Sequence, residues 1–97
     1  MDHMDKRERE RIYQAALHKY GFEAQAIVAI EELSELQKEI CKTLRGGGSR
    51  DAFAEEIADA WIMLEQMQLF MDLKQMTQDQ MDRKLIRLQR RLREEVE

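Results

Sequence analysis

The chain contains no proline, and three of its four glycines are consecutive, at Gly46–Gly48. Proline and glycine are the residues that most strongly interrupt helices, so the long segments between these points are free to be helical. Charged residues make up 37% of the 97 residues and hydrophobic residues 43%, which is typical of amphipathic helices and not of a turn-rich β-sandwich. We therefore expect an all-α fold, with residues 1–97 forming a single domain.

Glycines, capping residues and apolar spacing divide the chain into four predicted helices. They run over residues 5–19, 22–44, 51–72 and 77–93. Gly21 ends the first and the glycine run ends the second, because glycine adopts backbone conformations that stop a helix. Ser49 or Asp51 can cap the third helix, and Thr77 the fourth, through a side-chain oxygen. This pattern predicts a four-helix-bundle-like protomer.

Apolar side chains recur at steps of three and four residues in the second helix, which predicts a face that packs in the core. These residues are Ile27, Ile30, Leu33, Leu36, Ile40 and Leu44. The third helix has two apolar faces. One holds Phe53, Ile57, Ala60, Leu64, Met67 and Met71, and the other holds Ile62, Met63 and Phe70. A chain of this length has too little material to cover a helix on both sides, so we expect oligomerisation through the second face.

Charge is distributed unevenly along the chain. Residues 23–65 contain ten acids and four bases, whereas residues 83–93 contain six bases and no acid. The acidic part attracts metal cations and repels nucleic acid, and the basic part attracts phosphate. A ligand that carries both metal and phosphate suits both parts, and we do not expect nucleic acid as a partner.

Two features bear on the cellular compartment. The longest stretch without a charged side chain is seven residues, far below the ~20 apolar residues that span a membrane. The initial MDHMDKRERE lacks the apolar segment of a secretory signal, and the single Cys41 cannot form an intramolecular disulfide. We therefore expect a cytoplasmic protein without membrane contact.

Two pairs of carboxylates have the same spacing on adjacent predicted helices. Glu32 and Glu35 share one flank of the second helix, and Glu56 and Asp59 lie on the third. Like charges at this spacing repel each other on a helix, and a divalent cation reverses that effect. Mg²⁺ prefers oxygen ligands and is often coordinated by both protein carboxylates and substrate phosphates. The pairs are therefore candidate metal ligands, and the alternative is a solvated acidic surface, which is common in a chain with 20 acids.

The stretch from Tyr20 to Met67 resembles the all-α nucleoside triphosphate pyrophosphohydrolases of the MazG type, especially their short phage-type members. The family pattern is EExxE, a spacer of roughly a dozen to under thirty residues, and then ExxD. In this chain the pattern consists of Glu31-Glu32-Leu33-Ser34-Glu35, twenty intervening residues, and Glu56-Ile57-Ala58-Asp59. The match is complete and in the family's order.

The resemblance implies that Mg²⁺, or Mn²⁺ in its place, is bound by Glu32, Glu35, Glu56 and Asp59. It also implies that water cleaves an NTP or dNTP between the α and β phosphates, giving a nucleoside monophosphate and pyrophosphate. Glu35 or Glu32 would then be the catalytic base. Similar proteins form homodimers or homotetramers, and the sequence does not distinguish these states.

Five further residues are candidates for substrate binding: Lys84, Arg87, Arg91, Gln25 and Arg45. The first three can share one helix face and bind phosphate oxygens, or they can be solvated cations that favour the negative end of the helix dipole. Gln25 resembles a family glutamine that faces the base, and its alternative is an exposed helix residue. Arg45 resembles a recurrent family arginine, and its alternative is a helix C-cap.

A second function class fits the same residues. In a non-catalytic helical interaction module, the acids form a solvated face and the doubly apolar helix binds a protein partner. A nucleic-acid-binding protein fits less well, because the acidic middle of the chain opposes a phosphate backbone.

Overall fold

The computed structural model describes residues 3–96, and all regular structure in this range is helical. Its elements are α1 (Lys6–Tyr20), α2 (Phe22–Leu44), α3 (Arg50–Phe70) and α4 (Lys74–Val96). The expected all-α class is confirmed, and α2 has the predicted bounds. The predicted start of α4 at Thr77 is wrong, because the Thr77 N–H already donates to the Leu73 carbonyl within the first turn. Within the described range, no helix combines the length and apolar character needed to cross a membrane.

Short side-chain and glycine caps define the first three helices. The Asp5 carboxylate accepts a hydrogen bond from the Glu8 N–H at the start of α1. Gly21, with φ of 87°, ends α1 and donates its N–H to the Leu17 carbonyl, as predicted. Of the two predicted caps of α3, Ser49 is the one used, because its hydroxyl accepts from the Ala52 N–H at 3.1 Å. These caps fix the bounds of the hairpin that carries the acidic residues.

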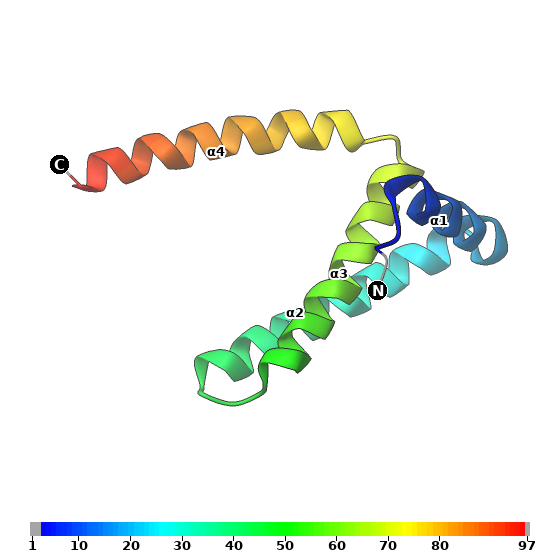
Figure 1. Cartoon of the computed structure of the whole chain (residues 1–97), viewed down its shortest axis with the longest axis horizontal. Helices are drawn as coiled ribbons and strands as arrows, with labels where there is room; N and C mark the ends of the chain where they lie inside the picture. Colours follow the sequence, from blue (N-terminus) through cyan, green and yellow to red (C-terminus); the bar gives the residue numbers. More distant parts are fainter. Residues whose placement is uncertain (1–2, 97) are drawn as a thin grey trace.

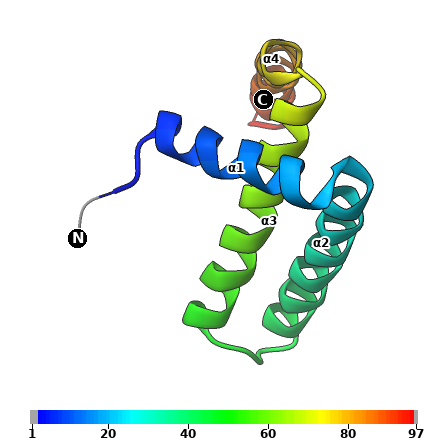
Figure 2. The same ribbon diagram turned by 90° about the vertical axis from the view of Figure 1, so that its right-hand side faces the viewer.

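Helices α2 and α3 form an antiparallel hairpin closed by the glycine loop, and α1 crosses its open end (Figures 1 and 2). Helix α4 leaves the end of α3 and extends away from the other three helices (Figure 1). Asp72 has φ of 53°, a left-handed backbone conformation that redirects the chain before α4 begins. The expected four-helix-bundle arrangement within one protomer is therefore wrong: three helices pack together and the fourth projects.

The faces that α2 and α3 turn toward each other are more polar than predicted. Their buried residues are Gln25, Ala29 and Glu39 on α2, and Ala60, Met63 and Gln66 on α3. The predicted core stripe of α2 is mostly exposed, as shown by Ile30 at 68% and Leu44 at 83%. Ile57 and Leu64 of the predicted α3 stripe are exposed as well. Ala60 of the predicted α3 stripe is buried as expected, at 2% exposure, but most of the predicted core positions are not buried in one protomer, because α4 projects away and leaves these stripes uncovered (Figure 1).

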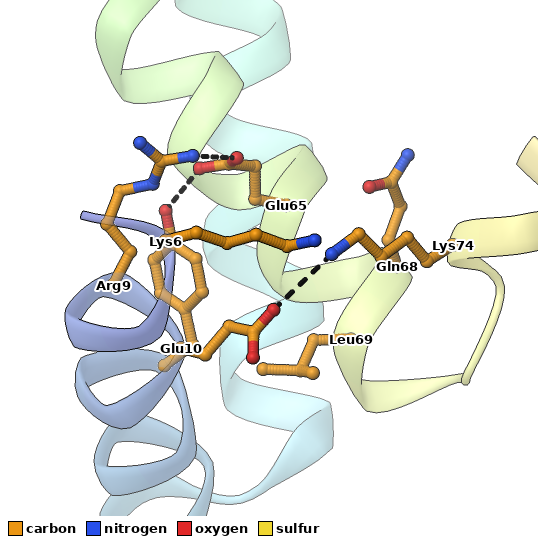
Figure 3. Close-up of a pocket in the computed structure, with 8 residues that line it drawn as sticks. Lys6, Arg9, Glu10, Glu65, Gln68, Leu69 and Lys74 are labelled. Atoms are coloured by element: carbon orange, nitrogen blue, oxygen red, sulfur yellow. Dashed lines mark hydrogen bonds and ion pairs between the residues drawn. The ribbon is translucent and has the colours of Figure 1, made fainter. Parts of the chain in front are cut away.

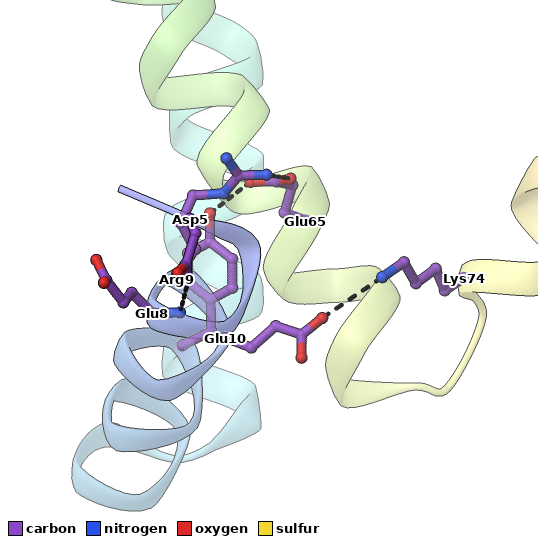
Figure 4. Close-up of polar contacts among 7 residues, drawn as sticks. Asp5, Glu8, Arg9, Glu10, Glu65 and Lys74 are labelled. Carbon is purple, nitrogen blue, oxygen red and sulfur yellow. Dashed lines mark hydrogen bonds and ion pairs between the residues drawn. The ribbon is translucent and has the colours of Figure 1, made fainter. Parts of the chain in front are cut away.

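Helix α1 is attached to α3 by a partly buried polar contact. The Tyr13 hydroxyl donates to Glu65 Oε1 at 2.6 Å, and Arg9 Nη2 donates to Glu65 Oε2 at 2.9 Å (Figure 4). These two hydrogen bonds occupy both carboxylate oxygens of Glu65. Tyr13 itself is buried. Burial and the hydrogen bond to Glu65 raise the pKa of Tyr13 to about 12. The neutral phenol is the form that stabilises the fold.

We expect Tyr13→Phe to lower the free energy of unfolding by about 1.5–3 kcal/mol at pH 8, the value of a hydrogen bond to a charged group. The tyrosine pKa in an unfolded chain is about 10. The stabilisation is therefore complete below pH 10 and is lost as the pH rises toward 12, the pKa of Tyr13 in the fold. Urea unfolding of both proteins between pH 8 and pH 12 checks this, and a difference that stays constant over the range would contradict it.

At Gly48 in the glycine loop, both the backbone conformation and the surrounding space favour glycine. Gly48 has φ of 74°, a conformation that L-residues rarely adopt. A Cβ at Gly48 would lie 2.7 Å from Oε1 of Glu39, which is buried beneath the loop. Gly47 differs, because a Cβ there would make an ordinary contact at 3.5 Å with the Lys42 carbonyl. The two neighbouring glycines therefore form a matched pair for mutation.

We expect Gly48→Ala to lower the free energy of unfolding by about 1–3 kcal/mol through backbone strain and displacement of Glu39. Gly47→Ala should leave it unchanged or raise it slightly, because alanine restricts the unfolded chain. Chemical denaturation of the two variants measures the difference. Equal effects at both positions would show that the loop relaxes freely around an added methyl group.

Candidate metal centre

Three of the four predicted metal ligands meet in the middle of the α2–α3 hairpin. Glu32 comes from α2, and Glu56 and Asp59 come from α3, one turn apart on the face that packs on α2. All three are half-buried, and one carboxylate oxygen from each lies within 4.8 Å of the other two. The spacing of the motif therefore places carboxylates from two helices on the same side of the hairpin. We name these three residues the acidic cluster.

The size of the acidic cluster suits a divalent cation. Magnesium–oxygen bonds are about 2.1 Å long, so two oxygens on one ion lie about 3–4 Å apart. One oxygen of each carboxylate already lies within 4.8 Å of the other two, so small side-chain rotations would bring them to this separation. Oε2 of Glu56 is buried and has no hydrogen-bond partner among the described residues. A carboxylate oxygen in this state is costly unless a cation or a proton satisfies it, so the residues fit a metal ion.

The electrostatics of the acidic cluster point the same way. Burial, followed by the charges of Asp59, Glu32 and Glu35, raises the pKa of Glu56 above its ordinary value. Burial and then the charge of Asp59 also raise the pKa of Glu32. Both shifts arise because desolvation and like charges disfavour the ionised form. The folded chain therefore holds these carboxylates at a cost that a divalent cation would remove.

Glu35, the fourth predicted ligand, lies outside the acidic cluster. Its side chain is exposed, and its Oε1 is 3.3 Å from Nζ of Lys38. Glu35 is nevertheless near enough for its charge to raise the pKa of both Glu32 and Glu56. An exposed ion pair of this kind contributes little stability, so the side chain is free to exchange Lys38 for another partner.

The substrate-binding candidates on α2 are placed differently from one another. Gln25 is buried, so its interpretation as an exposed helix residue is wrong. It lies two turns before Glu32 on the face that packs on α3. Arg45 is exposed and is the C-cap residue of α2, where its N–H donates to the Cys41 carbonyl. It lies about 20 Å from Glu32 along the helix axis, because each residue adds 1.5 Å.

The three candidates on α4 are not brought to the acidic cluster of their own chain. Lys84, Arg87 and Arg91 are all exposed on α4, which contacts the hairpin only near its connection to α3. Helix α4 leads these side chains away from the hairpin (Figure 1). One protomer therefore separates the predicted metal ligands from the predicted phosphate ligands.

One buried acid was not recognised as part of the hairpin interior. Glu39 is 7% exposed, its Oε1 has no hydrogen-bond partner among the described residues, and its Oε2 is 3.8 Å from Nζ of Lys42. The sequence did contain a signal, because Glu39 follows Glu32 by seven residues, or two turns, and therefore shares its face. The sequence instead predicts the core at the apolar stripe beside this face, and the carboxylates on its flank.

Comparisons of the chain with protein-family models, with curated proteins and with solved structures gave no match.

Proposed function

We propose that the protein is a Mg²⁺-dependent nucleotide pyrophosphohydrolase that cleaves an NTP or dNTP between the α and β phosphates. One observation carries the proposal: half-buried carboxylates from two helices face one another, and one of their oxygens is buried with no hydrogen-bond partner in the described part of the chain. A solvated acidic surface would instead spread its charges apart. The EExxE and ExxD motifs of MazG-type enzymes, which the chain resembles, supply the reaction class.

Glu32, Glu56 and Asp59 would hold the cation, and Glu35 would join them after releasing Lys38. A bound Mg²⁺, or Mn²⁺ in its place, supplies neutralisation of the triphosphate charge and lowers the pKa of a coordinated water. Four carboxylates carry enough negative charge for one or two such ions.

The reaction requires a base that takes a proton from the attacking water. The bond between the α phosphorus and its bridging oxygen breaks, and the products are a nucleoside monophosphate and pyrophosphate. Glu35 is exposed and can approach a water beside the acidic cluster. Glu32 belongs to the acidic cluster itself and is the second candidate for this role. We assign the proton transfer to these two residues and keep both in the proposal.

We further propose that the active form is a homo-oligomer in which a second copy covers the exposed apolar faces. Trp61 is 62% exposed on α3, and α4 exposes Met81, Leu85, Leu88 and Leu92 at steps of four, three and four residues. Such a stripe fits a partner helix. The charges are also complementary, because the hairpin is acidic and α4 is basic. A dimer or tetramer that places α4 of one copy on the hairpin of another would bring Lys84, Arg87 and Arg91 to a triphosphate.

The alternative function is a helical interaction module, which the same exposed apolar residues favour. In that case the acidic cluster would bind no metal, and its repulsion would be a defect without a compensating role.

A pyrophosphate-release assay over a panel of NTPs and dNTPs, with Mg²⁺, with Mn²⁺ and with chelator, tests the proposed reaction. We expect metal-dependent release from at least one nucleotide and a matching yield of its monophosphate. Release of inorganic phosphate without pyrophosphate would assign a different bond. An inactive protein whose melting temperature does not respond to either metal would favour the interaction module.

A further inference from the structure

A second charged site lies at the junction from which α4 leaves the other helices. It is a cavity of about 70 Å³ between α1, the end of α3 and the first residue of α4 (Figure 3). Its charged lining residues are Lys6, Arg9, Glu10, Glu65 and Lys74. Three cations against two carboxylates leave this junction cavity with a net charge of +1 in an otherwise acidic protein.

The two carboxylates of the junction cavity are already engaged. Glu65 accepts from both Arg9 and Tyr13 through its two oxygens. Glu10 reaches Lys74, with 3.4 Å between Oε1 and Nζ (Figures 3 and 4). Lys6 has no ion pair among the described residues, and Nε of Arg9 is buried without an acceptor. The unsatisfied groups in this cavity are therefore donors.

The unpaired Lys6 also faces another cation. Figure 3 shows the ammonium group of Lys6 directed at that of Lys74, although the two residues come from different helices. Close approach of the Lys74 ammonium group, and then its charge, lower the pKa of Lys6. Two ammonium groups in contact repel each other, and an anion between them replaces this repulsion by two favourable charge-assisted hydrogen bonds.

We propose that the junction cavity binds a small dianionic oxyanion, of the class of inorganic phosphate or sulfate, between Lys6 and Lys74. The cavity is small, with a volume of about 70 Å³, and its unsatisfied donors suit a compact free anion. Lys6 belongs to α1 and Lys74 begins α4, so the bound anion ties the projecting helix to the packed helices. This site uses none of the acidic cluster and does not rest on the proposed enzymatic function.

An amide NMR titration of the full chain with inorganic phosphate tests the site. The buffer contains chelator to exclude metal, and sodium chloride keeps the ionic strength constant. We expect saturable shifts centred on Lys6, Lys74 and the following turn of α4, and the same pattern with sulfate. Lys6→Gln and Lys74→Gln should each weaken binding about tenfold or more, because each removes a charged donor. Lys6→Arg keeps the charge and should retain binding.

Lys19→Gln is the matched control. Lys19 is an exposed lysine of α1 outside the cavity lining, with its Nζ 5.3 Å from the centre of the Tyr20 ring. The Lys19→Gln substitution removes the same charge and should leave the affinity for phosphate unchanged. Shifts that do not saturate, or that centre on residues 83–93 and vanish in Arg87→Gln, would overturn the proposal. Equal weakening by Lys19→Gln would also overturn it, because binding would then follow overall charge.

Discussion

Asp59→Asn is expected to abolish pyrophosphate release while making the metal-free protein more stable. Asp59 would be a metal ligand, and its loss should lower turnover at least about a hundredfold. Its charge also raises the pKa of both Glu56 and Glu32. Raised carboxyl pKa values mean that ionisation of these groups opposes folding at neutral pH. Removing one charge of the acidic cluster therefore raises the melting temperature in the presence of chelator.

The pH dependence distinguishes this explanation from a general stabilisation. The pKa values of Glu32 and Glu56 are higher in the folded than in the unfolded chain. The metal-free wild type should therefore gain stability as the pH falls from neutral toward the ordinary glutamate pKa. Asp59→Asn should reduce this gain. Magnesium should raise the melting temperature of the wild type at pH 7 and leave that of Asp59→Asn almost unchanged.

Glu55→Gln is the matched control for Asp59→Asn. Glu55 is exposed, precedes Glu56 on α3 and contributes least among the charges that raise the pKa of Glu56. The substitution removes one negative charge from the same helix but no proposed ligand. We expect full turnover and a full magnesium response. If Asp59→Asn kept its turnover, or Glu55→Gln lost as much, the acidic cluster would not be the catalytic centre.

Hybrid oligomers of two inactive variants are expected to regain activity. Asp59→Asn damages the acidic cluster, and Arg87→Ala damages the phosphate ligands on α4. Since α4 leads away from its own hairpin, each complete site would combine the hairpin of one copy with α4 of another. A two-fold symmetric hybrid then contains one intact site and one doubly damaged site. Hybrids purified through two different tags should show about half the wild-type activity per dimer.

A second hybrid provides the control. Asp59→Asn combined with Glu56→Gln places both changes in acidic clusters, so every site of the hybrid is damaged and no activity should return. An inactive Asp59→Asn with Arg87→Ala hybrid would mean that hairpin and α4 act within the same copy. Full activity of Arg87→Ala alone would remove Arg87 from the substrate site.

The helices could be predicted from sequence because their signals are local. Gly21, Ser49 and the glycine run act on the backbone next to them, and these positions end or begin helices as expected. The start of α4 was missed because Thr77 is a plausible cap whose role depends on the preceding turn. That turn is set by the left-handed backbone of Asp72, and no periodicity in the sequence indicates it.

The three members of the acidic cluster could be predicted from the sequence. The pairing of Glu35 and the covering of the apolar stripes could not. The spacing of Glu56 and Asp59 placed both on one face of α3, and Glu32 meets them across the hairpin. The separation of Glu35 depends on its pairing with Lys38, a choice of side-chain rotamer that helix geometry does not fix. Apolar periodicity predicted that the stripes are covered, but it does not specify which chain covers them.

Because few apolar residues are buried, the stability of this protein should depend on its concentration. Only Tyr13, Ala29, Ala60 and Met63 form the buried apolar interior of the described protomer. An isolated copy therefore gains little from the hydrophobic effect, and self-association would supply most of the missing burial. By mass action, dilution then weakens folding and assembly together. In the proposed oligomer, the folded fraction would therefore rise with protein concentration.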